Sequence, residues 1–276
     1  MIGLIIALCI VVIILLVVLI TSIRIVRQTE KVIVERAFYP YADQNVQNPG
    51  YKLTNTFADP DAYEIVNFFI NDNVADQVDL MVSNVETRNV TAPGHSAETA
   101  PVVFTFHHLL TKINVKIKRS ADFAQALNKK VIRITARLYG MKKKGNCVSG
   151  VWNTLPADVN PIGFTSSFEN KDGLLTSAAA ELQLWENGLM LVPQDVNGVK
   201  LEVEFVVEHW DTATPPKLTK TTTETQLMTL PTTVEWANAK QITYMAQIEA
   251  NSNIVFLSPK VEPWVESSSS NSIVIK

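Results

Sequence analysis

Histidine side chains are the usual general acids, general bases and metal ligands near neutral pH, and this chain has four of them. They are His95, His107, His108 and His209. His107 and His108 are adjacent in a strand-like stretch, where neighbouring side chains point to opposite faces, so they are poorly placed to share a metal ion. We interpret them as packing or interface residues and predict no metal site.

The remaining groups that could do chemistry are also scattered. Four carboxylates lie in predicted loops, with no order typical of a glycosidase acid and base: Asp59, Asp61, Asp72 and Asp76. Cys9 lies in an apolar run and Cys147 in a polar loop, so no disulfide framework is expected. The sequence contains no GxSxG, HExxH, phosphate-loop or GxGxxG motif. It therefore predicts no catalytic residue, no cofactor and no enzyme activity.

The composition is that of a folded chain without a nucleic-acid partner. Charged residues make up 18% of the 276 residues, and the formal net charge is −3. Beyond Arg36, apolar and polar residues alternate with period two, which is typical of strands with one buried face. Four stretches show this most clearly: Lys112–Arg119, Val131–Gly140, Val199–Trp210 and Gln241–Ala250. We predict a mainly β fold built from antiparallel sheets, as in β-sandwiches.

The buried faces of these strands can be read from the alternation. In Val131–Gly140 the predicted face is Ile132, Ile134, Ala136 and Leu138. The faces predicted for the other three strands are Ile113, Val115 and Ile117; Val199, Leu201, Val203, Phe205 and Val207; and Ile242, Tyr244, Ala246 and Ile248. Turn clusters separate the strands, among them Lys142–Asn146 and Asp195–Gly198. Helix is scarce. Ser120–Lys130 is predicted to form a short helix with Ser120 as its N-cap, crossing between two strands, and Ser177–Trp185 is a second candidate.

The first segment predicts a membrane anchor. Residues 1–23 carry no charged side chain and are long enough to cross a hydrocarbon core of about 30 Å as a helix. In residues 24–36 apolar residues alternate with polar ones, which is typical of a short strand, here next to the membrane. Arg24, Arg27 and Lys31 follow the apolar run, so the positive-inside rule places the body in the cytoplasm. Residues 1–36 resemble the opening of stomatin/prohibitin-like (SPFH, band 7) membrane scaffolds, and the resemblance stops there.

Several stretches of the remaining chain together resemble the fimbrillin family of Bacteroidales cell-surface proteins. The stretches are Ala37–Gln44 with Tyr39 and Pro40, Val78–Asn84, Val102–Lys118 with Phe106 and His108, Asn187–Val207 with Pro193 and Gln194, and Trp236–Glu266 with Pro263 and Trp264. The combined resemblance covers residues 37–276.

This resemblance implies tandem β-sandwich-like domains of the fimbrillin, or transthyretin-like, kind. We expect a truncated N-terminal domain over residues 37–100 and a C-terminal domain over residues 101–276, with the boundary near the loop Thr91–Pro101. The shortened first domain should present an open sheet edge. The resemblance also implies export and display on the cell surface, with the anchor of residues 1–23 holding the chain in the envelope.

Pilins of the family polymerise by donor-strand exchange after proteolysis at an arginine, which here would be Arg36. The tail residues Ile273, Val274 and Ile275 form a candidate donor strand, although an ordinary final edge strand would look the same. The expected partners are other fimbrial subunits or further copies of this chain.

Two other functions stay open at this stage. An SPFH-type membrane scaffold would agree with the cytoplasmic orientation, but its domain does not follow Arg36. A carbohydrate-binding surface module is the other, because Trp152, Trp185 and Trp210 could stack on sugars if exposed, although such residues more often cover a core. Its partner would be a host or bacterial surface glycan or protein. We side with the fimbrial interpretation, since it covers most of the chain.

Overall fold

The computed structural model describes eight stretches of the chain: residues 31–35, 38–39, 52–54, 63–84, 86–90, 105–125, 128–155 and 163–264. The predicted anchor, residues 1–23, lies outside them. Within these stretches no helix is long and apolar enough to cross a membrane.

The chain divides into two compact units. Unit 1 comprises residues 1–35, 86–102 and 274–276, and its described part is a two-stranded antiparallel sheet. Here β1 (Lys31–Glu35) pairs with β6 (Glu86–Val90), with Lys31 opposite Val90 and Glu35 opposite Glu86. β1 is the strand within the segment predicted to be juxtamembrane.

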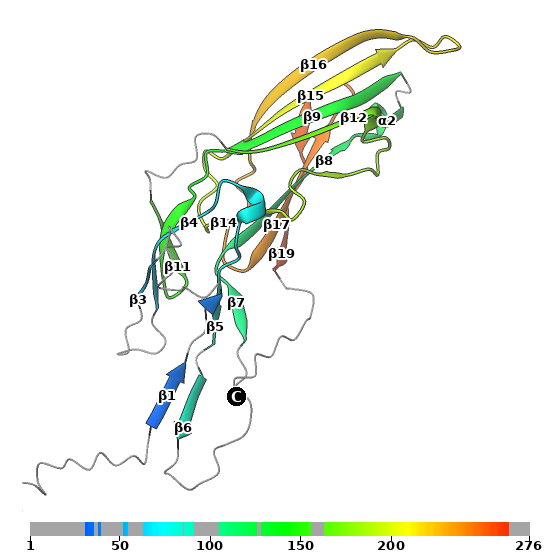
Figure 1. The fold of residues 1–276 in the computed structure, drawn as a ribbon. Coiled ribbons are helices and arrows are strands. Elements are labelled where there is room, and N and C mark those ends of the chain that lie inside the picture. Colours follow the sequence, from blue (N-terminus) through cyan, green and yellow to red (C-terminus); the bar gives the residue numbers. More distant parts are fainter. Residues whose placement is uncertain are drawn as a thin grey trace, which may run out of the picture. The chain divides into compact units, whose positions relative to one another are not determined.

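Unit 2, residues 36–85 and 103–273, contains a β-sandwich (Figure 1). One sheet has the order β12 (Phe164–Leu174), β9 (Lys129–Tyr139), β15 (Lys200–Trp210) and β16 (Leu218–Thr229). The other is centred on β8 (Thr111–Arg119) and β17 (Lys240–Ile248). β13 (Leu182–Gln183) and β14 (Leu189–Leu191) extend it beside β8, and β18 (Ile254–Phe256) and β19 (Lys260–Pro263) beside β17. The mainly β fold predicted from the sequence is confirmed.

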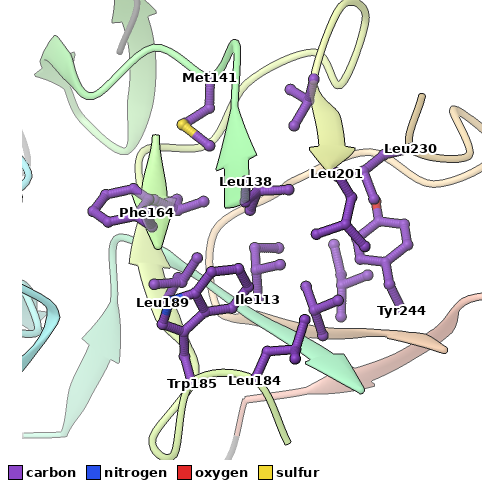
Figure 2. Packing of buried hydrophobic residues seen from close by; sticks show 14 of the residues in the cluster. Ile113, Leu138, Met141, Phe164, Leu184, Trp185, Leu189, Leu201, Leu230 and Tyr244 are labelled. Atoms are coloured by element: carbon purple, nitrogen blue, oxygen red, sulfur yellow. The ribbon is translucent and has the colours of Figure 1, made fainter. Parts of the chain in front are cut away.

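The core lies between the apolar faces of these two sheets. Figure 2 shows Ile113 of β8 and Tyr244 of β17 with Leu138 of β9 and Leu201 of β15 in one buried cluster. Each of the four side chains is fully buried. Burial of a side chain of this size contributes about 1.5–3 kcal/mol, so the period-two faces hold the sandwich together.

Three of the four predicted strand faces are correct as predicted, and one is shifted. In β9 the buried residues are Val131, Ile134, Ala136 and Leu138, whereas Ile132 is only half-buried. The pairing between β9 and β15 changes register here, since Val206 lies opposite Arg133 and Val207 opposite Val131. A bulge adds one residue to one strand, and this reverses the alternation at its end.

One expectation about strand direction is wrong. β8 and β17 pair in parallel, with Ile113 opposite Ile242 and Ile117 opposite Ala246. Alternation of apolar and polar residues indicates which face of a strand is buried, but it does not indicate the direction of the neighbouring strand. The chain between β8 and β17 passes through the other sheet, and such a long crossover allows parallel pairing.

The first predicted helix is present but shorter than predicted, since Lys129 and Lys130 at its expected end belong to β9, and the second is absent. α2 (Ala121–Gln125) links β8 to β9, and Oγ of Ser120 accepts a hydrogen bond of 3.2 Å from the backbone N–H of Phe123, as an N-cap does. Ser177–Trp185 instead forms a turn and β13. The prediction of helix there was wrong because Leu184 and Trp185 are buried in the core, and the backbone N–H of Leu184 bonds to the carbonyl of Val115.

Two smaller sheets complete unit 2. The first has the order β11 (Val151–Thr154), β10 (Lys144–Val148), β4 (Glu64–Phe69) and β3 (Lys52–Thr54). β10 replaces most of the turn predicted at Lys142–Asn146, because it pairs on both sides. The second has the order β2 (Phe38–Tyr39), β5 (Met81–Ser83) and β7 (Phe106–His108), and the 3-10 turn η1 (Val74–Asp76) precedes β5. The predicted boundary loop, Thr91–Pro101, lies outside the described residues, so the division into two domains stays a prediction.

Candidate functional site

A buried histidine–aspartate pair joins two of the stretches singled out in the sequence. Nδ1 of His108 lies 2.6 Å from Oδ2 of Asp79, and the two side chains are only 8% and 10% exposed. The other carboxylate oxygen of Asp79 has no hydrogen-bond partner among the described residues. A contact this short in a buried setting is a strong hydrogen bond, and either partner would be costly to leave alone.

Trp264, from another of these stretches, Trp236–Glu266, lies against His108. Its ring stacks on the ring of His108, with centroids 4.0 Å apart and planes 5° from parallel. The ammonium of Lys112 lies 5.6 Å from the centre of the Trp264 ring, within cation–π range. The backbone N–H of Trp264 donates to the carbonyl of Ala239, which fixes the chain just after Pro263 and β19.

Backbone pairing holds the same region together. Phe106 lies opposite Ser83 and His108 opposite Met81 in the ladder between β5 and β7. The backbone N–H of Leu109 donates to the carbonyl of Leu80. His108 is thus placed by strands from distant parts of the sequence. We call His108, Asp79 and Trp264 a structural joint, because their contacts hold these segments of the fold together.

Gln194 forms a second joint. Its Oε1 accepts from the backbone N–H of Lys142 at 2.7 Å, and its Nε2 donates to the carbonyls of Lys142 at 2.7 Å and Val192 at 3.0 Å. Its own backbone N–H donates to the carbonyl of Trp236. The side-chain amide therefore acts like an added backbone unit that ties the connection between β9 and β10 to the chain before β15. Pro193, the preceding residue, is half-buried.

The other candidate chemical groups lie apart from this site. His107 is exposed, on the opposite face from buried His108, as the alternation predicts. Nε2 of His209 lies 3.1 Å from the hydroxyl of Thr222, and burial, then the charges of Lys129 and Lys220, lower its pKa. Among the residues with described side chains, no three His, Cys, Asp or Glu could hold a metal ion together. His95 lies outside the described residues.

The predicted loop carboxylates behave as surface charges where they are described. Asp72, 67% exposed at its side chain, forms an ion pair with Lys143 at 2.9 Å. Asp76 accepts from the side-chain amide of Asn73 at 2.6 Å, within η1 and its cap. Asp59 and Asp61 lie outside the described residues.

The three tryptophans considered for sugar stacking differ in their surroundings. Trp185 is 4% exposed and belongs to the core. Trp152 packs on Phe68 with ring centroids 5.7 Å apart, and its Nε1 donates to the carbonyl of Leu109. Trp210 is half-buried and lines an open hollow. Trp152 also lines an open hollow, but the wall of that hollow has no cationic side chain, whereas three cationic side chains line the hollow beside Trp210.

Several predicted site residues are not described by the structure: Arg36, Pro40, Ile273, Val274 and Ile275. Tyr39 is described as the end of β2, opposite Met81. The residue that sequence reasoning missed is Asp79. A single aspartate among apolar neighbours in Val78-Asp79-Leu80-Met81 was the available signal, since a buried carboxylate needs a partner.

Comparison with known proteins decides the family. The Fimbrillin-like family model matches residues 34–264, most of the chain. This chain belongs to the Fimbrillin-like family. The match begins at Val34, inside β1, and ends at Trp264, the residue stacked on His108. It does not extend to residues 1–33, and the resemblance of residues 1–36 to SPFH scaffolds stays a prediction.

A fimbrial protein of known structure shares the fold of this Fimbrillin-like chain, and two cell adhesion proteins of known structure are similar to it at lower TM-scores. A fimbrial protein from Bacteroides vulgatus is 19% identical, with a TM-score of 0.63 over 83% of this chain and 77% of that one. A candidate cell adhesion protein from Bacteroides ovatus is 18% identical, with a TM-score of 0.48 over 87% and 70%. One from Bacteroides uniformis is 17% identical, with a TM-score of 0.41 over 86% and 74%. No curated protein matches the chain.

Proposed function

We propose that this chain is a non-enzymatic subunit of a cell-surface fimbria or an adhesin-like structural protein. The observation that carries the proposal is the family match over residues 34–264. The site formed by His108, Asp79 and Trp264 supports it, because the polar groups there are used to join segments of the fold. The partners would be other fimbrial subunits or further copies of this chain.

The subunits would assemble by strand addition. Arg36 directly follows β1, so cleavage after Arg36 would separate β1 from the rest of the chain. β6 would then lose its antiparallel partner and expose unpaired N–H and C=O groups along Glu86–Val90. An extended segment of another subunit could pair there, with backbone hydrogen bonds giving affinity and alternate side chains giving specificity.

The tail residues Ile273, Val274 and Ile275 are the segment we propose as the donor. β1 reads Lys-Val-Ile-Val-Glu and the tail reads Ile-Val-Ile-Lys, so both carry three consecutive β-branched residues beside a charge. Such residues favour extended backbone, and the tail could take the place of β1. The serine-rich stretch before it, Ser267–Ser272, would act as a tether.

The fimbrial role requires the body of the protein to reach the cell surface, with its two predicted domains, residues 37–100 and 101–276, outside the cell. Protease treatment of intact cells that express the native gene tests this directly. We expect the body to be digested while a cytoplasmic marker protein is protected. A body that stays intact until the cells are lysed would contradict surface display and would favour the cytoplasmic orientation given by the positive-inside rule.

A further inference from the structure

An open hollow of about 1040 Å³ lies at the end of the sandwich where β8 and β15 end and β9 begins. Figure 1 shows α2 at this end of unit 2, beside β9 and β12. Three cationic side chains and one tryptophan line the hollow: Arg119, Lys129, Lys130 and Trp210. The end of β12 with Thr176, Asn128 just before β9, and the loop after β15 form the rest of the wall.

Arg119 is the residue of the hollow that most needs a partner. It is 5% exposed, and its Nε is buried without a hydrogen bond. The guanidinium lies 5.5 Å from the centre of the Phe123 ring, but it forms no ion pair with any described residue. Burial lowers the pKa of Arg119. A buried cation without a counter-ion is destabilising, so the site would gain from an incoming anion.

Two lysines are held beside it without carboxylate partners in the described part of the chain. Nζ of Lys129 donates to the carbonyl of Ala250 at 3.1 Å and lies 5.6 Å from the Phe123 ring. Nζ of Lys130 donates to the carbonyl of Lys171 at 3.3 Å and lies 5.1 Å from the Trp210 ring. An ammonium has three donors, so each lysine keeps donors for a ligand.

Other cations on β9 are arranged differently. Arg133 and Arg137 each reach a glutamate of β15, Glu204 and Glu202, at 3.2 Å. Ion pairing is therefore available to basic residues on this sheet, and the cations of the hollow do not take part in it. The hollow therefore differs from an ordinary solvated sheet face, where basic side chains are paired with carboxylates.

The carboxylates near the hollow do not neutralise the positive charge of its three cationic side chains. Oδ1 of Asp211 accepts from the backbone N–H groups of Ala213 and Lys217, so this side chain is used to hold the loop after β15. Oε2 of Glu208 accepts from Nε1 of Trp210. Asp172 is exposed at the rim. The lining thus has three cations against two carboxylates, Asp172 and Asp211.

We propose that this hollow binds an acidic glycan, with an anionic group of one sugar held by Arg119 and the two lysines and its ring lying against Trp210. A guanidinium forms paired hydrogen bonds with carboxylate or sulfate oxygens. Indole rings offer an apolar face to sugar rings, and Asn128, Thr176 and Thr212 supply polar groups for hydroxyls. The volume suits an oligosaccharide better than a single small ion. This ligand role goes beyond subunit assembly and does not depend on it.

Calorimetric titration of the full chain tests the proposal with three probes: tetragalacturonic acid, its methyl ester and a sulfated galactose tetrasaccharide. We expect a charged probe to bind and the neutral ester to bind at least tenfold more weakly. A preference between the two charged probes would assign the anion as carboxylate or sulfate. Equal binding of the acid and its ester, or binding of neither charged probe, would overturn the proposal.

Variants locate the binding site. Arg119→Gln and Lys130→Gln should each weaken binding of the charged probe at least tenfold, and Trp210→Ala should weaken it as well. Lys130→Gln changes a side chain on the wall, so it keeps the test valid if Arg119→Gln fails to fold. Arg137→Gln is the matched control on the same strand and should bind like the wild type. An equal loss in Arg137→Gln, or none in Arg119→Gln and Lys130→Gln, would refute the site.

Discussion

Oδ2 of Asp79, two residues before β5, lies 2.6 Å from Nδ1 of His108 at the end of β7, although 29 positions separate the two residues in the chain. Trp264, near the other end of the described chain, stacks on the same imidazole. Three stretches that carry the resemblance to fimbrillins thus meet at one point. Their residue types are explained by packing and hydrogen bonding at this joint.

Replacing His108 with alanine should destabilise the protein strongly. The change removes the partner of a buried carboxylate and the surface on which Trp264 stacks. Breaking a buried pair of this kind costs about 3–5 kcal/mol. Urea unfolding followed by tryptophan fluorescence would measure the free energy of unfolding. His107→Ala, at the exposed neighbouring position, is the matched control and should change stability by less than about 0.5 kcal/mol. Similar effects of the two changes would show that the pair does not hold the fold.

The side-chain amide of Gln194 should stabilise the fold through its hydrogen bonds to the backbone of Lys142. Gln194→Leu keeps the size of the side chain but leaves the backbone N–H and C=O of Lys142 without their partners. The expected loss is about 2 kcal/mol, from unsatisfied backbone groups. Lys142→Ala alters the same contact only at a side chain that the bonds do not use, and it should be nearly neutral. If Lys142→Ala costs as much as Gln194→Leu, the amide bonds are not the source of the stability.

Local signals were enough to predict much of the sandwich. The alternation in Thr111–Arg119 and Lys240–Ile248 identified the buried faces of β8 and β17, because a half-buried strand must place apolar residues two apart. Ser120 gave the start of α2, since its hydroxyl satisfies a backbone donor within three residues. Each of these features depends on neighbours in the sequence.

Features set by distant residues could not be predicted in this way. β16, Leu218–Thr229, is a long edge strand made mostly of threonine and charged residues, and its position depends on pairing with β15. Its alternation of apolar and polar residues is weak because no side chain of β16 is fully buried, and the residues on its covered face between Thr222 and Met228 are only half-buried. The parallel pairing of β8 with β17, the bulge at Ile132 and the partner of His108 likewise depend on which segments meet. The alternation within a single strand carries no information about this.

Stability should fall at alkaline pH because of the buried thiol of Cys147. Burial raises the pKa of this thiol from its ordinary value of 9.0 to about 11. In the unfolded chain the thiol has its ordinary pKa and ionises more readily than in the folded protein. The contribution of the neutral thiol to the free energy of unfolding is therefore complete below pH 9 and is lost as the pH rises to 11. The full loss is about 2–3 kcal/mol.

Unfolding free energies of the wild type and Cys147→Ala between pH 8 and pH 11 would test this. Tyr244 is also buried, with its pKa raised to about 12, but it is present in both proteins and cancels in the comparison. The wild type should lose more stability over this range than Cys147→Ala. Parallel curves would show that the thiol does not ionise on unfolding in this range.

The donor-strand proposal predicts that assembly depends on the side chains along one face of the tail, residues 273–275. In an extended segment Ile273 and Ile275 lie on one face and Val274 on the other, so only one face can fill the pockets of an acceptor groove. Ile273→Ser combined with Ile275→Ser should therefore abolish polymers that resist mild detergent, while Val274→Ser, the control on the opposite face, should reduce them less. Electrophoresis without heating would separate polymers from monomers. Arg36→Gln should also block assembly, because β1 would stay attached and keep β6 occupied. Polymers that form normally in both the tail variant and Arg36→Gln would rule out assembly through this segment and this cleavage.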